Sequence, residues 1–237
     1  MKDILYIIVP AYNESENISS LIEDWYPIVE KHNGYGQSRL VIIDDGSKDN
    51  TYDIVMQHTK NMPYLEIIRK ENGGHGSSVL YGYRYAIKNN ADWIFQTDSD
   101  GQTLSSEFYD FWDKRTEHDA IIGNRSSRED GLSRKLVEKV VILLLWLYFG
   151  VKVPDSNAPF RLMKKELVEK YIDKLPNDFN LPNIMFTAYF SYFKENIVFQ
   201  KITFRPRQGG INSINIKKIV KIGYKALGDF HRLKKEI

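Results

Sequence analysis

Hydrophobic and polar positions alternate along the first half of the chain in a way typical of strands followed by helices. Apolar runs that predict strands cover residues 4–9, 40–43, 65–68 and 93–95, and each ends at a polar or proline-bearing turn. Helical spacing of apolar residues covers 18–29, 51–59 and 79–87. Strands that alternate with helices over short connections form mostly parallel sheets with helices on both faces. The pattern therefore predicts the α/β fold class.

The second half of the chain has a less regular pattern. Residues 120–122, 160–163 and 198–204 are strand-like, and residues 134–149 have helical spacing. That helix contains the longest apolar run, VVILLLWLYF. A helix that spans a bilayer needs about 20 apolar residues. This shorter run predicts either a buried core helix or a helix lying on a membrane surface.

Residues 212–237 predict one amphipathic helix with a basic polar face. Seven Lys and Arg against two Asp and Glu give this segment a charge of +5. Such a helix can bind an anionic membrane surface, or it can pack its apolar side on the sheet and leave its lysines in solvent. The sequence leaves both alternatives open. The apolar positions that share one side are Ile216, Ile219, Val220, Leu227 and Phe230.

Composition narrows the class of protein. Hydrophobic residues make up 42% of the 237 residues and charged residues 27%, as in ordinary globular domains. The formal net charge of +2 does not indicate a nucleic-acid partner. Without cysteine the chain has no disulfide, zinc–cysteine site or thiol nucleophile, which fits a reducing compartment. We expect no signal peptide, and we expect one domain because no repeat or low-complexity linker divides the chain.

The sequence TDSDGQ follows the strand-like run at 93–95 and contains two carboxylates one residue apart, Asp98 and Asp100. At a strand end both side chains can project into one cleft, where they repel each other unless a cation lies between them. Oxygen ligands of this kind suit Mg²⁺ or Mn²⁺, and such a metal neutralises charge on a diphosphate leaving group. The alternative is a polar turn without a metal.

Three further polar motifs follow predicted strands, where the ligands of α/β sheets bind. VPAYNE (9–14) stands where dinucleotide-binding proteins have glycines, which argues against NAD and FAD. DDGSKDNT (44–51) places carboxylates at a strand end, where they can accept hydrogen bonds from a base or a ribose. NGGHG (72–76) is a glycine-rich turn into a helix, and backbone N–H groups at a helix start favour anions.

These four motifs, in this order and spacing, resemble the family-2 glycosyltransferases with the GT-A fold. The resemblance implies that Asp98, Asp100 and Gln102 hold Mn²⁺ or Mg²⁺ together with the diphosphate of a nucleotide-sugar donor. It also implies an inverting transfer of the sugar. The nucleotide site that it implies consists of Pro10, Tyr12, Glu14, Asp45, Gly74, His75 and Asp98.

The later part of the chain resembles the polyprenyl-phosphate branch of that family, which includes dolichol-phosphate-mannose synthases. Gly123-Asn124-Arg125 follows a strand-like run, and RPRQGG (205–210) matches the arginine- and glycine-containing loop of the branch. DSNAPFR (155–161) matches its Asp-x-x-Ser-Gly-Phe-Arg, with Ala-Pro in place of Ser-Gly. The planar fork of arginine binds phosphate in a bidentate manner. Candidates for the acceptor phosphate are therefore Arg125, Arg134, Arg205 and Arg207.

The chemistry of the acceptor decides which catalytic groups are needed. A phosphate acceptor is already an anion near neutral pH and needs cationic positioning. A sugar hydroxyl needs a general base, for which Asp155 is the candidate, and Asp100 and Asp155 are the predicted catalytic residues. Asp155 can equally orient a phosphate acceptor or Arg161, so its presence leaves both acceptors open.

We expect one GT-A domain in which residues 1–102 bind the nucleotide sugar, 103–211 bind the acceptor and 212–237 form the basic helix. The expected function is transfer of a sugar to polyprenyl phosphate, in the cytoplasm with peripheral contact to the inner face of the cell membrane. One alternative is transfer to a saccharide hydroxyl in cell-surface polysaccharide synthesis. Another is a non-catalytic nucleotide-binding module.

Overall fold

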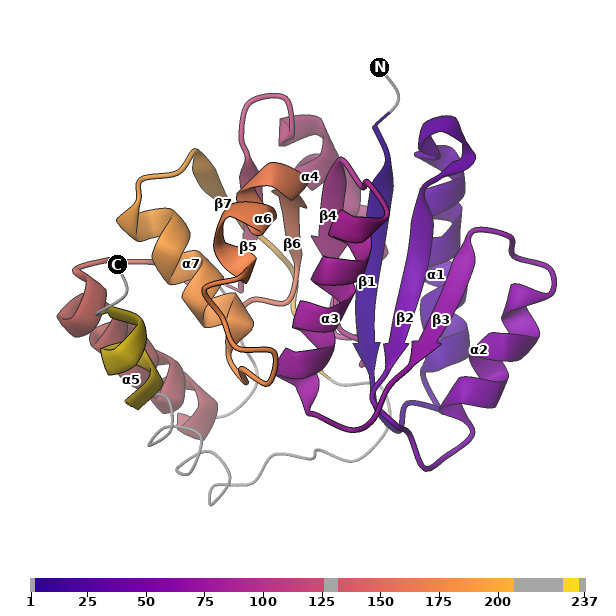
Figure 1. Cartoon of the computed structure of the whole chain (residues 1–237), viewed down its shortest axis with the longest axis horizontal. Coiled ribbons are helices and arrows are strands. Elements are labelled where there is room, and N and C mark those ends of the chain that lie inside the picture. The colour runs from indigo at the N-terminus through magenta and orange to yellow at the C-terminus, as the bar shows by residue number, and fades with distance from the viewer. Residues whose placement is uncertain (1–2, 126–131, 207–227, 235–237) are drawn as a thin grey trace.

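The computed structural model describes residues 3–125, 132–206 and 228–234. These residues form one seven-stranded sheet with helices on both sides (Figure 1). Its strands are β1 (Leu5–Ala11), β2 (Arg39–Asp44), β3 (Leu65–Arg69), β4 (Trp93–Gln96), β5 (Ala120–Asn124), β6 (Arg161–Lys164) and β7 (Ile197–Lys201). Their order across the sheet is β3-β2-β1-β4-β6-β5-β7.

All of these strands except β6 run in the same direction. β1 pairs in parallel with β2 and β4, β2 with β3, and β5 with β7. β6 lies antiparallel between β4 and β5. The predicted α/β fold with a mostly parallel sheet is confirmed. Because the parallel strands end at one edge of the sheet, the segments that follow them come together there.

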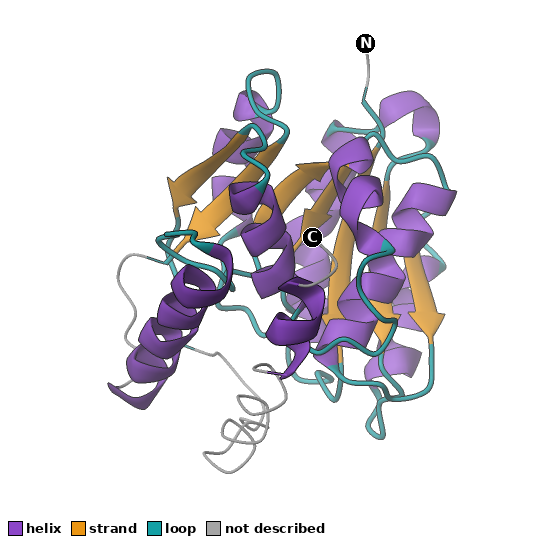
Figure 2. Cartoon of the chain, turned by 60° about the vertical axis from the view of Figure 1, so that its left-hand side comes forward, coloured by secondary structure: helices purple, strands orange, loops and turns teal. Residues whose placement is uncertain are grey.

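Helices cover both faces of the sheet, which is twisted (Figure 2). Residues of α1, α2 and α4 share one apolar cluster with the sheet, and residues of α3, α5, α6 and α7 share the other. The bounds are α1 (Ile18–Lys31), α2 (Thr51–Thr59), α3 (His75–Lys88), α4 (Phe108–Lys114), α5 (Leu132–Phe149), α6 (Lys165–Ile172) and α7 (Pro182–Tyr192), with 3₁₀ turns at Gly34–Gly36 and Ser105–Glu107.

The alternation of side chains along β1 explains why there are two apolar layers. Leu5, Ile7 and Val9 belong to the α1 side, whereas Tyr6 and Ile8 belong to the α3 side. Successive residues of a strand point to opposite faces, so a strand covered on both sides is apolar at every position. All seven residues of β1 are accordingly buried.

The expectation that the first strand ends at Pro10 is wrong, because β1 continues to Ala11. The amide of Thr97 donates to the carbonyl of Ile8, so Ile8 presents its backbone to β4, and Pro10, two residues on, faces the same side. Pairing with β4 ends at the register of Ile8 and Gln96. The missing N–H of proline therefore costs no hydrogen bond of the sheet.

Other boundaries also differ from the sequence prediction. α3 begins at His75 rather than at residue 79, directly after Gly74, whose φ of +87° is suited to glycine. β7 ends at Lys201 rather than at residue 204, because β5, its partner strand within the described ranges, ends at Asn124 in the paired register. The sequence analysis did not predict α4, α6 or α7.

From residue 138 onward, helix α5 has one buried side and one exposed side. Leu145 and Phe149 are buried in the core, whereas Val140, Leu143, Trp146 and Leu147 are 47–61% exposed. The prediction of a core helix is therefore correct for one face, and an apolar stripe remains on the other. Within the described residues no helix is long and apolar enough to cross a membrane.

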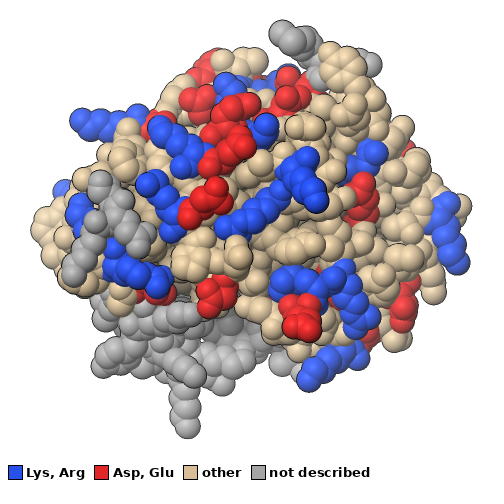
Figure 3. All heavy atoms as spheres, viewed as in Figure 1, with Lys and Arg blue, Asp and Glu red and all other residues tan. Residues whose placement is uncertain are grey.

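Of the predicted C-terminal helix, residues 228–234 are described, and they are helical. Phe230 and Leu233 are 1% exposed, and the ring of Phe230 contacts Phe149 and Tyr148 of α5. The sequence left open whether the tail binds a membrane or packs on the domain. Residues 228–234 pack on the domain. Basic and acidic side chains are interspersed on the face of the molecule shown in Figure 3.

Candidate functional site

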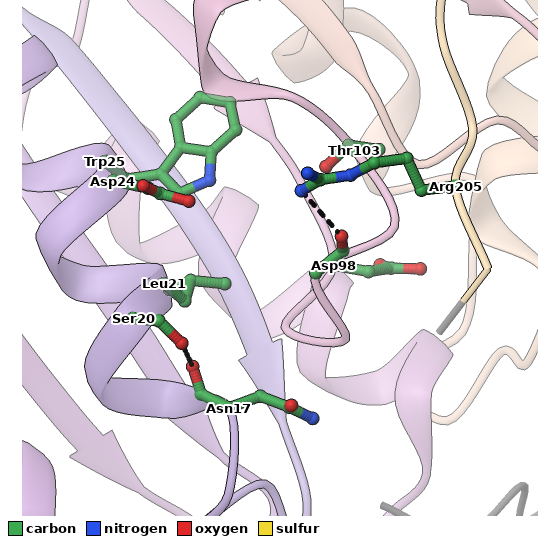
Figure 4. A pocket seen from close by; sticks show the side chains of 9 residues that line it. Asn17, Ser20, Leu21, Asp24, Trp25, Asp98, Thr103 and Arg205 are labelled. Carbon is green, nitrogen blue, oxygen red and sulfur yellow. Dashed lines mark hydrogen bonds between the residues drawn. The ribbon is translucent and has the colours of Figure 1, made fainter. Parts of the chain in front are cut away.

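The carboxyl-terminal edge of the sheet gathers the polar motifs. At this edge the strand order reverses between β1 and β4, which is where ligands of open α/β sheets bind. A small pocket of about 40 Å³ lies at this point, between α1 and the turn after β4 (Figure 4). It is lined by Asn17, Ser20, Leu21, Asp24, Trp25, Asp98, Gly101, Thr103 and Arg205.

The turn after β4, which we call the β4 turn (residues 97–103), carries the two predicted metal-binding carboxylates. The hydroxyls of Thr97 and Thr103 lie 2.8 Å apart and close its base. Gly101 has a φ of +69°, and the backbone N–H of Gln102 donates to Oδ1 of Asp100 (3.2 Å). Residues 97–103 thus form a polar turn. The turn places the side chains of Asp98 and Asp100 at the carboxyl-terminal edge of the sheet.

His75 faces Asp98 across the site, with Nε2 3.0 Å from Oδ1 of the carboxylate. Partial burial would lower the pKa of His75, but the charge and hydrogen bond of Asp98 outweigh it and raise the pKa. Burial would raise the pKa of Asp98, but the charge and hydrogen bond of His75 outweigh it and lower the pKa. The first residue of α3 thus favours a charged carboxylate on the β4 turn.

The donor atoms of the β4 turn fit Mg²⁺ or Mn²⁺. The described residues contain no group of three His, Cys, Asp and Glu side chains with the geometry of a metal site. The carboxylates of Asp98 and Asp100 and the amide oxygen of Gln102 remain the predicted ligands of a metal here. Such an all-oxygen set leaves coordination positions for water and for phosphate oxygens, which is the usual way that these metals bind nucleotides.

Asp45 holds the glycine-rich turn in place. Its two carboxylate oxygens accept from the backbone N–H groups of Gly73 (2.9 Å) and Gly74 (2.8 Å), and Lys70 Nζ lies 2.5 Å from Oδ1. Asp45 is 3% exposed. The sequence analysis missed Lys70, although a basic residue directly after a strand-like run, opposite a conspicuous Asp pair, was a usable signal.

The predicted nucleotide-binding residues at the end of β1 and just after it differ in how far their side chains are exposed. Tyr12 is 39% exposed, so its ring is accessible for stacking, whereas Glu14 is 7% exposed. The carboxylate of Glu14 accepts from the side-chain amide of Asn17 (2.8 Å). Pro10 lies inside β1 and is buried. Direct contact of these three residues with a nucleotide remains a prediction.

Arg125 and Asp155 form a buried ion pair, with side chains 5% and 1% exposed. Nε and Nη2 of Arg125 donate to the two carboxylate oxygens at 2.7 and 2.8 Å. The backbone N–H groups of Arg125 and Asn157 also donate to them. Burial would raise the pKa of Asp155, but the hydrogen bonds and charge of Arg125 outweigh it and lower the pKa. Such a carboxylate is a weak base.

Of the other predicted acceptor arginines, Arg205 lies within the described residues. Nη2 of Arg205 donates to the carbonyl of Gly101 (3.1 Å), and its buried Nε has no hydrogen-bond partner. Arg207 and the side chain of Arg134 lie outside the described residues. Arg161, matched to the family motif, is fully buried and donates to the carbonyls of Ala158 and Asn183 rather than to Asp155.

The fold and these strand-end groups define the GT-A class of glycosyltransferases. A structure of glucosyl-3-phosphoglycerate synthase from Mycobacterium tuberculosis with Mn²⁺, uridine-diphosphate-glucose and phosphoglyceric acid has a TM-score of 0.71 at 14% identity, over 98% of this chain and 80% of that one. S. aureus TarS 1–349 with UDP-GlcNAc has a TM-score of 0.60 at 17% identity, over 92% and 64%.

The model of the family Glycosyl transferase family 2 matches residues 6–172, and the chain belongs to this family. An uncharacterized glycosyltransferase, YkoT of Bacillus subtilis (strain 168), is 30% identical over 176 residues, which are 70% of this chain and 51% of the relative. The chain thus spans about half the length of that relative.

Two relatives carry names that agree with the predicted branch. The UDP-N-acetylglucosamine–dolichyl-phosphate N-acetylglucosaminyltransferase of Methanococcus voltae is 24% identical over 73% of this chain and 74% of the relative. The undecaprenyl-phosphate 4-deoxy-4-formamido-L-arabinose transferase of Photorhabdus laumondii is 21% identical over 93% and 66%. The resemblance to the polyprenyl-phosphate branch is confirmed.

Proposed function

We propose that this protein transfers a sugar, with inversion, from a nucleoside diphosphate sugar to a polyprenyl phosphate. The observation that carries the proposal is that two carboxylates and a guanidinium follow strands that end at the same edge of the sheet. Asp98 and Asp100 stand on the β4 turn, and Arg125 follows β5 beyond the antiparallel strand β6. An edge with carboxylates on one part and a guanidinium on another suits a metal-bound donor diphosphate beside an anionic acceptor.

The donor side of the mechanism rests on positioning and charge. A metal held by Asp98, Asp100 and Gln102 would supply positive charge to offset the negative charge of the diphosphate leaving group. His75 favours the ionised form of Asp98, and Asp45 fixes the glycine-rich turn, whose backbone we place beside the nucleotide as part of the proposal. Tyr12, exposed after β1, is our candidate for stacking on the base. Glu14 and Gly74 complete the proposed nucleotide contacts.

The state of Asp155 favours a phosphate acceptor over a sugar hydroxyl. Both of its oxygens are engaged by Arg125, and its lowered pKa makes it a poor proton acceptor. A phosphate acceptor carries its own negative charge and needs no base. We therefore propose that Asp155 orients Arg125, which binds the acceptor phosphate, and that no proton is passed to Asp155. Arg205 is a second candidate for the phosphate.

We further propose that the protein works in the cytoplasm and contacts the membrane peripherally through α5. The exposed stripe of Val140, Leu143, Trp146 and Leu147 is apolar, and Lys139 beside it is exposed. Apolar residues with a tryptophan and a basic neighbour are typical of helices that lie in the headgroup region. Because α5 leads from the segment after Arg125 to the loop that carries Asp155, this contact would hold the acceptor side of the site near the lipid.

The test offers radiolabelled nucleotide sugars, with Mn²⁺, to the protein together with polyprenyl phosphate or with oligosaccharide. We expect an organic-phase product, and we expect Arg125→Lys to raise the KM for the lipid phosphate. Label only in water-soluble saccharide would instead support the hydroxyl acceptor. Nucleoside diphosphate binding without any transfer or hydrolysis would point to a non-catalytic module and would overturn the proposal.

A further inference from the structure

Residues 203–206, which we call the β7 segment, are fastened to the β4 turn by three hydrogen bonds. The backbone N–H of Arg205 donates to the carbonyl of Gln102 (2.8 Å). The side-chain amide nitrogen of Gln102 donates to the carbonyl of Arg205 (2.8 Å). Nη2 of Arg205 donates to the carbonyl of Gly101 (3.1 Å). Residues 103 positions apart in the chain are thus joined in both directions.

The same segment has two further anchors. The backbone N–H of Thr203 donates to both carboxylate oxygens of Glu107, at 2.9 and 3.0 Å. The ring of Phe204 contacts the guanidinium of Arg125, whose Cζ lies 5.1 Å from the ring centroid. The β7 segment therefore runs from Glu107, past the arginine proposed for the acceptor, to the turn proposed for the metal.

The contact with Arg205 fixes which way the amide of Gln102 points. A carbonyl oxygen can only accept, so the group that faces it must be the NH₂ of the amide. The amide oxygen of Gln102 is then the atom that can bind a cation. The side chain of Gln102 is 6% exposed, so it is packed in this orientation. One residue can thus contribute an oxygen to the metal and a donor to the β7 segment.

We propose that Gln102 is a positioning residue that sets the affinity for the acceptor: its amide nitrogen holds the β7 segment, and with it Phe204, against Arg125. The proposal rests on the proposed transfer function. It assigns to Gln102 a task distinct from metal binding. Loss of that task would weaken acceptor binding while the metal and the donor still bind.

Gln102→Glu separates the two tasks, because a carboxylate keeps an oxygen for the metal but has no N–H for the carbonyl of Arg205. In the protein without ligands, we expect the amide hydrogens of Thr203 and Arg205 to exchange about fivefold faster, the effect of one lost hydrogen bond. Mn²⁺ titration should show binding at least as tight as in the wild type. In transfer assays, KM for the acceptor should rise about fivefold.

Glu107→Ala is the second variant, because it releases the other end of the β7 segment without touching the β4 turn. It should give the same faster exchange and the same rise in acceptor KM, with unchanged Mn²⁺ binding. Gln200→Glu is the matched control: it makes the same chemical change on β7, where the side-chain oxygen accepts from Lys114, and exchange at 203–206 should stay at the wild-type rate.

Wild-type exchange or wild-type acceptor KM in both Gln102→Glu and Glu107→Ala would overturn the proposal. The exchange readout needs no substrate, so a protein that transfers no sugar would refute the proposed function, and wild-type exchange at 203–206 in both variants would refute the positioning role separately. Conversely, normal transfer with unchanged exchange in both variants would refute the positioning role alone.

Discussion

The buried pair of Arg125 and Asp155 allows a quantitative prediction. In Arg125→Met the carboxylate, 1% exposed, loses its two guanidinium hydrogen bonds and, among the residues that the structure describes, keeps the backbone N–H groups of residues 125 and 157. Removing one partner of a buried ion pair costs about 3–5 kcal/mol, because a buried charge is left uncompensated. The two remaining hydrogen bonds offset part of this, so we expect a loss of about 3 kcal/mol in the free energy of unfolding at neutral pH.

The deficit should depend on pH with a definite sign. In the wild type the pKa of Asp155 is lowered, so its contribution to stability is present above the ordinary carboxyl pKa and is lost as pH falls through the folded value. In Arg125→Met, the hydrogen bonds and charge of the guanidinium no longer oppose burial, so the pKa of Asp155 rises relative to the wild type. Protonation in mild acid then relieves the buried charge, and the deficit of the variant shrinks as pH falls.

Urea unfolding at neutral pH and in mildly acidic buffer measures both quantities. Arg115→Met is the matched control, because Arg115 pairs with Asp3 at 2.8 Å but both side chains are more than a fifth exposed. Such a pair contributes about 0–1 kcal/mol. The double variant Arg125→Met/Asp155→Leu should be more stable than Arg125→Met alone. A deficit no larger than that of the control, or one that is the same at both pH values, would refute the reasoning.

Three further predictions follow from the site and its surroundings. Asp98→Asn should abolish the Mn²⁺-dependent part of the rise in melting temperature caused by a nucleoside diphosphate, measured by thermal shift over UDP, GDP, CDP and dTDP; an unchanged rise would exclude Asp98 as a metal ligand. Gly76→Ala should destabilise the protein by about 1–3 kcal/mol in urea unfolding, because an added Cβ would lie 2.3 Å from the carbonyl oxygen of Phe179. Gly36→Ala, where nothing lies within 4 Å of the added Cβ but φ is +77°, shows the backbone cost alone and should be milder. Leu147→Glu should reduce cosedimentation with anionic vesicles, whereas Met56→Glu, an exposed apolar position on α2, should not; equal binding of both variants would argue against α5 as the contact.

The sequence predicted the first half of the fold well because strands and helices there alternate with clear periodicity. The apolar runs of β1 to β4 and the helices α1 and α2 lie close to their predicted bounds. α7 was missed because it is buried on nearly every side and has no polar face to set a helical period. α4 and α6 are short, and their few residues give little periodic signal.

The sequence predicted which residues of the candidate site follow a strand, but it did not predict which of them contact one another. The segments bearing Asp45, His75 and Asp98 each follow a strand, and the structure brings them to one edge. The partners of these residues depend on contacts between distant segments. Neither the pairing of Arg125 with Asp155 nor that of Gln102 with Arg205 can be seen in the sequence. The first depends on the pairing of β6 with β5, and the second depends on β7 joining the far edge of the sheet.

The position of β6 has a consequence for how the protein forms during synthesis. β1 to β4 are made first, but β4 gains its second neighbour only when residues 161–164 emerge, and β5 gains its first neighbour then too. A nascent chain that stops before this strand leaves the open edge of β4, with the buried Phe95, as a template for unwanted pairing. Synthesis must therefore reach β6 before the open edge of β4 is covered and before β5 can join the sheet.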